Sequence, residues 1–182
     1  MTEKEIITGC IKKNAVCQRL LFDQYSRKLM TLCLRYARTA PDAEDMLQES
    51  FIKIFSAIHQ YRFEGSFEGW IKRVTVSVCL RKLQETKIRF DDVSALESTK
   101  HALHPDVIDS LSEKELMQLI SSMPDGYRVV FNLSVMEGYT HDEIAAFLNI
   151  EAVTSRSQLM KARRWLQKKI LANQKITVKH AG

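Results

Sequence analysis

Residues 138–166 carry the sequence GYTHDEIAAFLNIEAVTSRSQLMKARRWL, which predicts a short helix, a turn and a longer helix. Thr140 stands three residues before Glu143, which is the spacing of a capping box at a helix start. Asn149 is a suitable left-handed stop for that short helix. The longer helix is expected from about Val153 to Leu171, because apolar and small residues recur there at helical spacing. Its predicted buried stripe consists of Ser155, Leu159, Ala162, Leu166 and Ile170.

This order of elements is that of a helix-turn-helix, whose second helix enters the major groove of DNA. The side chains expected on its outer face are Thr154, Arg156, Ser157, Gln158, Met160, Lys161 and Arg164. Arg and Lys donate to guanine and Gln pairs with adenine, whereas Ser and Thr near helix starts, including Thr140, usually contact phosphates. The alternative is a solvated basic face on an ordinary amphipathic helix, but the capping box, turn and basic helix in sequence favour DNA.

The rest of the chain is also predicted to be helical. Apolar residues recur at three- and four-residue spacing, and Pro41 suits the first turn of a helix. The β-branched residues at 74–78 make a strand conceivable, but the absence of a predicted partner strand favours a helix. Helices are therefore expected at residues 20–33, 41–58, 70–83, 116–123 and 124–138, with a break at 61–69.

The composition of the chain restricts the classes of function that it could have. The chain has 182 residues and a formal net charge of +5, which is compatible with a polyanionic partner. Neither the cysteines nor the histidines show metal-ligand spacing, and there is no glycine-rich phosphate loop or nucleophile elbow, so we expect no enzyme activity and no cofactor. The N-terminus lacks an apolar signal core and no apolar run could span a bilayer, so the expected location is cytoplasmic. The four cysteines, expected to be reduced and partly in the core, are Cys10, Cys17, Cys33 and Cys79.

Charge is distributed unevenly, which suggests two domains. Residues 89–110 are polar and acidic, contain Pro105 and show no sustained periodicity, so they are expected to form a linker. From Arg156 onward the chain carries basic residues and no acid.

Two further segments have competing interpretations. The sequence YRFEGSFEGW at 61–70, followed by Lys72 and Arg73, could stack against unpaired bases, but its aromatic rings could equally close a hydrophobic core. On residue chemistry alone, the core interpretation is favoured. The acidic segment at 42–49 could dock a basic protein surface, or it could be a solvated helix start stabilised by the helix dipole. Composition leaves that choice open.

Taken in order and at this spacing, these motifs resemble those of extracytoplasmic-function (ECF) sigma factors, the minimal two-domain class of the sigma-70 family of RNA polymerase subunits. The resemblance covers about Leu20 to Ile170. Its segments are DAEDMLQESF at 42–51, YR at 61–62 through Phe67, WI at 70–71, MPDGYRVVF at 123–131, EGYTHDEIA at 137–145, TSRSQL at 154–159 and AR at 162–163.

The resemblance implies an all-α fold of two small helical domains joined by an extended acidic linker. Residues 1–88 would form the sigma region 2 helical bundle, and residues 111–176 would form the region 4 helix-turn-helix. The linker at 89–110 would thread toward the polymerase cleft and mimic the path of RNA, and residues 177–182 would be a tail.

The resemblance also implies binding roles. The residues expected to bind the clamp helices of the polymerase β′ subunit are Asp42, Glu44, Asp45, Gln48, Glu49 and Phe51. Those expected to capture and melt the −10 element are Tyr61, Phe63, Ser66, Phe67, Trp70, Lys72 and Arg73. Those expected at the −35 element are Thr140, Thr154, Arg156, Ser157, Met160, Lys161, Arg163 and Arg164. An anti-sigma factor, tethered to a membrane in some systems, is a further expected partner.

One departure stands out. Many family members carry Asn and, four residues later, Asp in the third helix, where this chain has Ser77 and Arg81. The leading hypothesis is a non-catalytic sigma factor that directs core polymerase to promoters. The alternatives are a stand-alone helix-turn-helix regulator and a protein-interaction module with an incidental basic tail.

Overall fold

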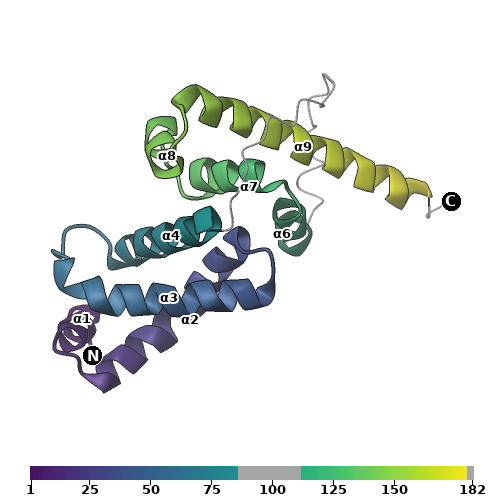
Figure 1. Ribbon diagram of the computed structural model, residues 1–182. Helices are drawn as coiled ribbons and strands as arrows, with labels where there is room; N and C mark the ends of the chain where they lie inside the picture. The colour runs from purple at the N-terminus through teal and green to yellow at the C-terminus, as the bar shows by residue number, and fades with distance from the viewer. Residues whose placement is uncertain (86–111, 180–182) are drawn as a thin grey trace. The chain divides into compact units, whose positions relative to one another are not determined.

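A computed structural model describes residues 1–85 and 112–179, and throughout these ranges the regular structure is helical (Figure 1). This confirms the predicted all-α fold. The chain divides into two compact units, Met1–Lys87 and Ile88–Gly182, which we describe separately. The predicted linker at 89–110 and the last three residues of the predicted tail lie outside the described residues. Within the described part, no helix has the length and apolar character needed to cross a membrane.

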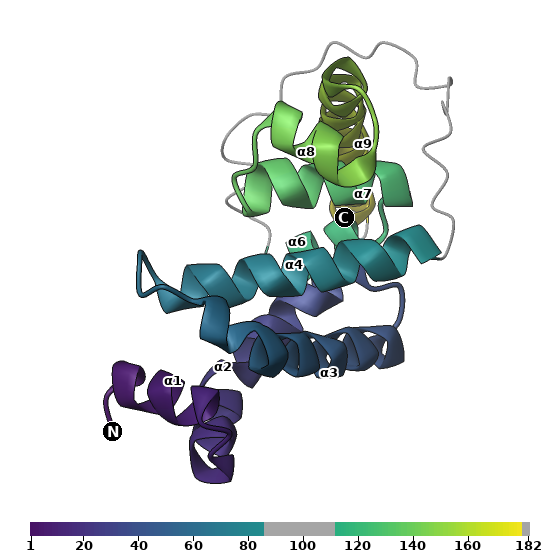
Figure 2. The ribbon, with the colours of Figure 1, turned by 60° about the vertical axis from the view of Figure 1, so that its left-hand side comes forward.

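The N-terminal unit is a bundle of four α-helices with one short 3₁₀ turn. Its elements are α1 (Glu3–Ile11), α2 (Ala15–Tyr36), α3 (Ala40–Ala57), η1 (Ile58–Gln60) and α4 (Phe67–Glu85). α3 packs along α4 and both pack on α2, while α1 covers the first part of α2 (Figure 2). The segment at 74–78 is helical, so the strand alternative is excluded.

Local signals explain where these helices begin. Asp42 and the N-cap residue Thr39 form a capping box at the start of α3. Pro41 lies in the first turn, where a backbone N–H would have no partner within the helix, so proline costs no hydrogen bond there. The Asn14 side chain accepts hydrogen bonds from two backbone N–H groups at the start of α2. Helix α1 was not predicted, although Thr2 and Glu5 form a capping box there too.

One continuous apolar core holds the N-terminal unit together. It joins Ile7 of α1 and Leu21 of α2 to Ile54 of α3 and Ile71 of α4, all of them essentially inaccessible to solvent. Each such side chain contributes about 1.5–3 kcal/mol relative to an exposed one. Leu20, the first residue of the helix expected at 20–33, is 39% exposed, because the buried face of α2 is centred on Leu21.

All four cysteines are buried and free, as predicted. Burial raises the pKa of the Cys10 thiol to about 11, so the thiol stays protonated near neutral pH. A protonated thiol is a poor nucleophile and a poor metal ligand, which agrees with a structural role in the core.

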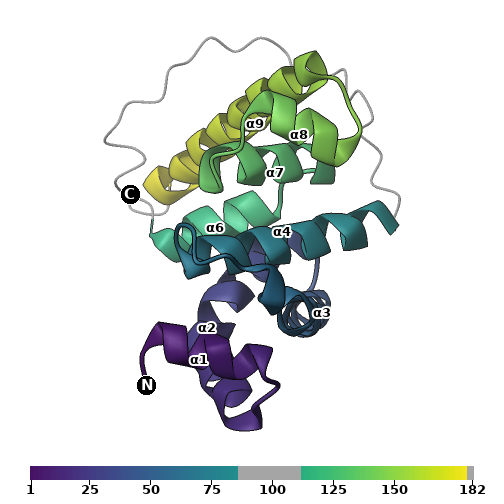
Figure 3. The ribbon, with the colours of Figure 1, turned by 90° about the vertical axis from the view of Figure 1, so that its left-hand side faces the viewer.

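The C-terminal unit contains the predicted helix-turn-helix. Its elements are α6 (Glu113–Ser121), α7 (Asp125–Phe131), the π-helix η2 (Asn132–Met136), α8 (His141–Leu148) and α9 (Ala152–Lys179). Both α7 and α8 pack against α9 (Figure 3). The capping box at Thr140 and the left-handed Asn149, with φ of 53° and ψ of 48°, are present as predicted.

Two features of this unit were not predicted. The helix that begins after Pro124 widens into a π-helix before it stops at Gly138, which has a φ of +77°. Helix α9 continues to Lys179, beyond the predicted end at Leu171. In the predicted stripe of α9, Ser155, Leu159, Ala162 and Ile170 are buried and Leu166 is half-buried.

Candidate nucleic-acid interface

The outer face of α9 carries the predicted −35 residues. Arg156 and Met160 are exposed one turn apart, and Arg163 and Arg164 are exposed on the turn that follows. Thr154, Ser157 and Lys161 are half-buried. This spacing places cationic and apolar side chains on one side of the helix, which is the arrangement that a major-groove helix requires.

Gln158 corrects one prediction. It was expected on the outer face, where it could pair with adenine, but it is 2% exposed. Gln158 lies three residues after Ser155 and next to Leu159, so its side chain follows the buried stripe of the helix. Its Oε1 atom has no hydrogen-bond partner among the described residues. A base contact by this side chain is therefore ruled out in this conformation.

A partly buried hydrogen bond joins the two helices of the motif. The His141 Nδ1 atom, at the start of α8, lies 2.9 Å from the Ser155 hydroxyl oxygen in the first turn of α9. Ser155 is fully buried, and a buried hydroxyl requires such a partner. The sequence places Ser155 on the buried stripe but does not reveal this contact, because its partner, His141, lies fourteen residues away on another helix.

Thr140, predicted to contact phosphate, is exposed at the start of α8, but its polar groups are already used. Its hydroxyl and its backbone N–H both donate to the Glu143 carboxylate at 2.8 Å, and the hydroxyl oxygen accepts from the Glu143 N–H at 3.3 Å. The backbone and hydroxyl hydrogen bonds from Thr140 hold the pKa of Glu143 below its usual range. A phosphate would have to displace or share this carboxylate.

The aromatic loop of the N-terminal unit is divided between core and surface. Tyr61 and Phe67 are buried with their ring centroids 5.1 Å apart, and the Tyr61 hydroxyl donates to the Gly65 carbonyl at 2.8 Å. Phe63 is 45% exposed and adopts a left-handed φ of 59°. Trp70 is half-buried against Tyr61 and Phe67. The core interpretation is therefore confirmed for Phe67 but not for Phe63, and Phe67 cannot itself contact a base.

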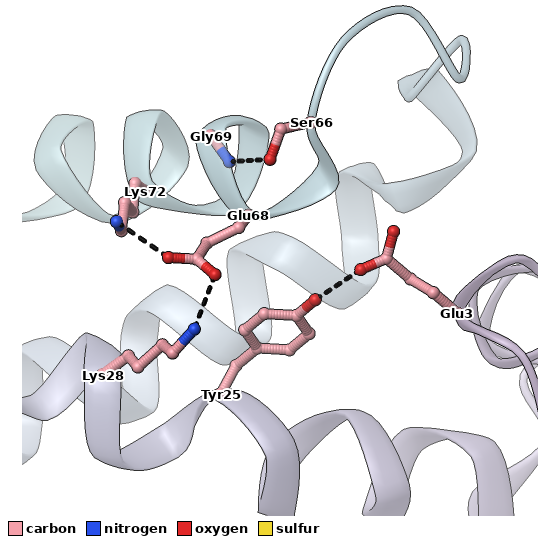
Figure 4. Close-up of polar contacts among 7 residues, drawn as sticks. All are labelled: Glu3, Tyr25, Lys28, Ser66, Glu68, Gly69 and Lys72. Carbon is pink, nitrogen blue, oxygen red and sulfur yellow. Dashed lines mark hydrogen bonds and ion pairs between the residues drawn. The ribbon is translucent and has the colours of Figure 1, made fainter.

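The start of α4 is fixed by two sets of polar contacts, one local to its N-terminal end and one toward α2 (Figure 4). Ser66, a predicted −10 residue, accepts a hydrogen bond from the Gly69 N–H at 3.2 Å. Lys72, another, forms an ion pair with Glu68 at 2.9 Å, and Lys28 of α2 approaches the same carboxylate at 2.6 Å. Hydrogen bonds from Lys28 and then Lys72 hold the pKa of Glu68 below its usual range. Both predicted residues thus have structural partners within the unit.

A separate groove lies between α3 and α4, with a volume of about 350 Å³. Of the two adjacent cations predicted near the −10 element, Arg73 lines this groove and Lys72 does not. Trp70 also lines it, as does Ser77, at the position where many family members carry Asn. The complete lining is Lys53, Ala57, Gln60, Trp70, Arg73, Val74, Ser77, Val78 and Arg81.

The acidic segment forms an exposed face on the first half of α3. Glu44, Asp45 and Gln48 are exposed, and so is Asp42, whose carboxylate also caps the helix. We call these four exposed side chains the acidic face; Asp42 and Asp45 also line a small pocket with Arg38 and Lys82.

Glu49 and Phe51 differ from the rest of that segment. Glu49 is bound to α4 by ion pairs to Arg81 at 2.8 Å and to Lys82 at 3.0 Å. Phe51, predicted to bind polymerase, is 4% exposed and packs on Phe22 with ring centroids 4.7 Å apart. The apolar stripe of α3 needs Phe51 inside, so this prediction is corrected to a role in the core.

Comparison with known proteins adds independent evidence. The family model "Sigma-70 region 2" matches residues 21–88, and the model "Sigma-70, region 4" matches residues 113–166. The "ECF RNA polymerase sigma-E factor" of Salmonella typhimurium is 29% identical over 184 residues, covering 93% of this chain and 95% of that protein. The chain belongs to the ECF class of the sigma-70 family. As a sigma factor, it directs RNA polymerase to promoters and is not an enzyme.

Other ECF sigma factors are similar to this chain to the same degree. The sigma-E factor of Escherichia coli K12 is 28% identical over 184 residues, covering 93% of this chain and 95% of that protein. SigE of Mycolicibacterium smegmatis is 29% identical over 155 residues, which cover 81% of this chain but 59% of the relative.

Two solved structures share the fold of this sigma factor. The sigma factor RpoE of Bartonella quintana, solved with the anti-sigma factor NepR, superposes with a TM-score of 0.53 at 16% identity and covers 85% of this chain and 96% of that one. CnrH, solved with the cytosolic domain of CnrY, gives a TM-score of 0.52 at 15% identity and covers 93% of this chain and 97% of that one.

Proposed function

We propose that this sigma factor binds the β′ clamp helices of core polymerase through the acidic face, Asp42, Glu44, Asp45 and Gln48. The observation that supports this is the exposure of three carboxylates on one helix surface, which suits a basic partner. Glu49 contributes indirectly, since its carboxylate is shared between Arg81 and Lys82. Phe51 supports α3 from the core.

The −10 element is proposed to meet the aromatic loop and the groove between α3 and α4. Phe63, the exposed ring of the loop, offers a surface on which an unpaired base can stack. Trp70 and Arg73 line the adjacent groove, where they could hold such a base. Tyr61, Ser66, Phe67 and Lys72 act by fixing the loop and the start of α4.

The −35 element is proposed to meet α9 in the major groove. Arg156, Met160 and Lys161 are nearest the bases, and phosphate contacts come from the set Thr140, Thr154, Ser157, Arg163 and Arg164. The supporting observation is the shared exposure of Arg156 and Met160 at the start of a helix whose opposite face is buried.

We also propose the domain boundaries implied by the resemblance, with region 2 at 1–88, the acidic linker at 89–110, region 4 at 111–176 and a tail at 177–182. The location is proposed to be cytoplasmic, where core polymerase acts. An anti-sigma factor is a proposed regulator, because both structural neighbours were solved with a protein of that kind or with a cytosolic partner domain.

Site-directed DNA cleavage tests these placements. The native cysteines are buried, so a cleavage reagent would couple selectively to Met160→Cys or to Phe63→Cys, at positions that are 47% and 45% exposed. In the polymerase–promoter complex, we expect cutting at the −35 element from the first and at the −10 element from the second. Cutting of the same element by both reagents would contradict the proposal.

A further inference from the structure

The residues that line the groove between α3 and α4 indicate which base the groove could bind. Its α4 wall is formed by Trp70, Val74, Ser77 and Arg81, which recur at three- and four-residue spacing on one face of the helix. The opposite wall is formed by Lys53 and Ala57 of α3 and by Gln60 of the following turn η1. A single helix–helix groove therefore has an aromatic end, an apolar floor and a polar rim.

The polar rim supplies mainly hydrogen-bond donors. Lys53, Arg73 and Arg81 can only donate, while Gln60 and Ser77 can donate or accept. Among the described residues that line the groove, none is acidic. A ligand with a donor-rich edge would therefore find few acceptors here, whereas one with adjacent acceptors would be well matched.

Guanine is the base that fits this donor set. Its N7 and O6 atoms are two neighbouring acceptors, and an arginine guanidinium can donate to both at once. Adenine presents an N6 donor beside N7, and cytosine presents an N4 donor, which an acidic side chain would accept. Thymine presents O4 beside a methyl group rather than beside a second acceptor, so it cannot take both donors of one guanidinium on that edge. The lining offers no such carboxylate among the described residues.

Two neighbours prepare the groove for this ligand. Glu49 holds the Arg81 guanidinium through an Nη2–Oε2 contact of 2.8 Å, which leaves other guanidinium donors for a ligand. The indole of Trp70 packs on Phe67 with nearly parallel rings 5.8 Å apart, so it is a rigid wall. The small side chain of Ser77 leaves space that a larger residue would fill.

We infer that the groove selects an unpaired guanine of single-stranded DNA, with Arg73 and Arg81 as the residues that determine this preference. The inference rests on the proposed function, in which the N-terminal unit holds the melted −10 strand. It adds which base is held and which side chains choose it.

Selection from a random pool tests the inference. Holoenzyme made from the full chain and core polymerase would be mixed with random single-stranded DNA, and the bound strands would be sequenced. We expect one enriched guanine. Replacing it with 7-deazaguanine, which lacks the N7 acceptor, should weaken binding about tenfold if a bidentate contact is lost.

Variants distinguish specific recognition of the base from non-specific attraction between positive charge and DNA. Arg73→Ala and Arg81→Ala should lose the preference for guanine, and Arg81→Lys should lose it while retaining more of the overall affinity, because lysine keeps the charge without the bidentate geometry. Arg19→Ala removes a positive charge that is exposed and lies outside the groove, and it should keep the preference. Circular dichroism would confirm that each variant folds.

The outcomes are distinct. Enrichment of a different base, or a guanine preference that survives both alanine variants, would overturn the inference while leaving the proposed function in place. Failure of the holoenzyme to bind any single strand would overturn the proposed function, and the inference with it.

Discussion

Glu49 shows how one side chain can connect two surfaces of the N-terminal unit. It belongs to the acidic segment of α3, yet its carboxylate is bound by Arg81 and Lys82 of α4. Hydrogen bonds from Lys82 and then Arg81 hold the pKa of Glu49 below its usual range. The sequence suggests that the Glu49 carboxylate is available to a binding partner, but in the structure it is bound by two cations of α4.

The lowered pKa of Glu49 makes a prediction about pH. A carboxylate with a lowered folded-state pKa stabilises the fold above its ordinary pKa of 4.5, and this stabilisation is lost as pH falls through the folded-state value. Because the side chain is partly exposed, Glu49→Gln should cost no more than about 1 kcal/mol at pH 7. Urea unfolding at pH 7 and at about pH 3 would measure it. A cost that is equally large at both pH values would contradict the ion-pair explanation.

The acidic face makes a second prediction. Glu44→Lys combined with Asp45→Lys should weaken binding to core polymerase and leave stability nearly unchanged, because both side chains are exposed. A competition assay against the unmodified chain would measure the affinity. Asp23→Lys, on an exposed part of α2, makes the same charge change as Glu44→Lys alone, so it is the control for that single variant and should bind normally. Equal loss with the control variant would show that net charge matters and the acidic face does not.

The recognition residues make a third prediction. Arg156→Ala and Lys161→Ala should each weaken binding to the −35 element by about 1–3 kcal/mol if a base contact is lost. Lys168→Ala, which removes an exposed charge further along α9, should have a smaller effect that does not depend on sequence. Promoter binding at a fixed salt concentration would compare them. Normal transcription by both variants from every cognate promoter would contradict the placement of α9.

At the scale of elements, the helix-turn-helix depends on the contact between α8 and α9. The hydrogen bond between His141 and Ser155 is partly buried where the two helices meet, so it helps to set their relative orientation. The outward side chains of α9 can act on DNA only if that orientation is kept. The contact is therefore structural, and it lies on the opposite side of α9 from the base-reading residues.

A double-mutant cycle tests this contact. Ser155→Ala and His141→Ala should each lower stability by about 1 kcal/mol, and the double variant should cost less than the sum of the two. Thermal or urea unfolding of the full chain would give the coupling energy. Strictly additive effects would mean that the hydrogen bond contributes nothing.

Some elements could be predicted from the sequence because their signals are local. The capping box at Thr140 and the left-handed Asn149 require only neighbouring residues, and both are present. Burial is harder, since it depends on how wide a helix face the rest of the domain covers. This is why Gln158, which was expected on the outer face of α9, proved to be buried.

Other parts of the site depend on contacts between distant residues. The groove needs Lys53 of α3 beside Arg73 of α4, and no periodicity in either helix indicates their register. The same is true of the ion pairs that hold Lys72 and Arg81. Helix α1 was not predicted, although the capping box at Thr2 is a local signal of a helix start.

At the scale of the whole molecule, the two units have different surfaces that both serve a sigma factor. The N-terminal unit combines an acidic face with a donor-lined groove, and the C-terminal unit presents a basic recognition helix. A stand-alone DNA-binding regulator would need only the second of these. The acidic face is the feature that separates a polymerase subunit from such a regulator.

The most direct test is to mix the purified chain with core polymerase, isolate any complex by gel filtration, and assay it for transcription from duplex promoter DNA. The promoters would be those that the protein occupies with polymerase in its own genome. A stable complex that starts transcription where core polymerase alone does not is the predicted result. Failure to bind polymerase, with duplex binding by the isolated chain, would contradict the account and favour a stand-alone regulator.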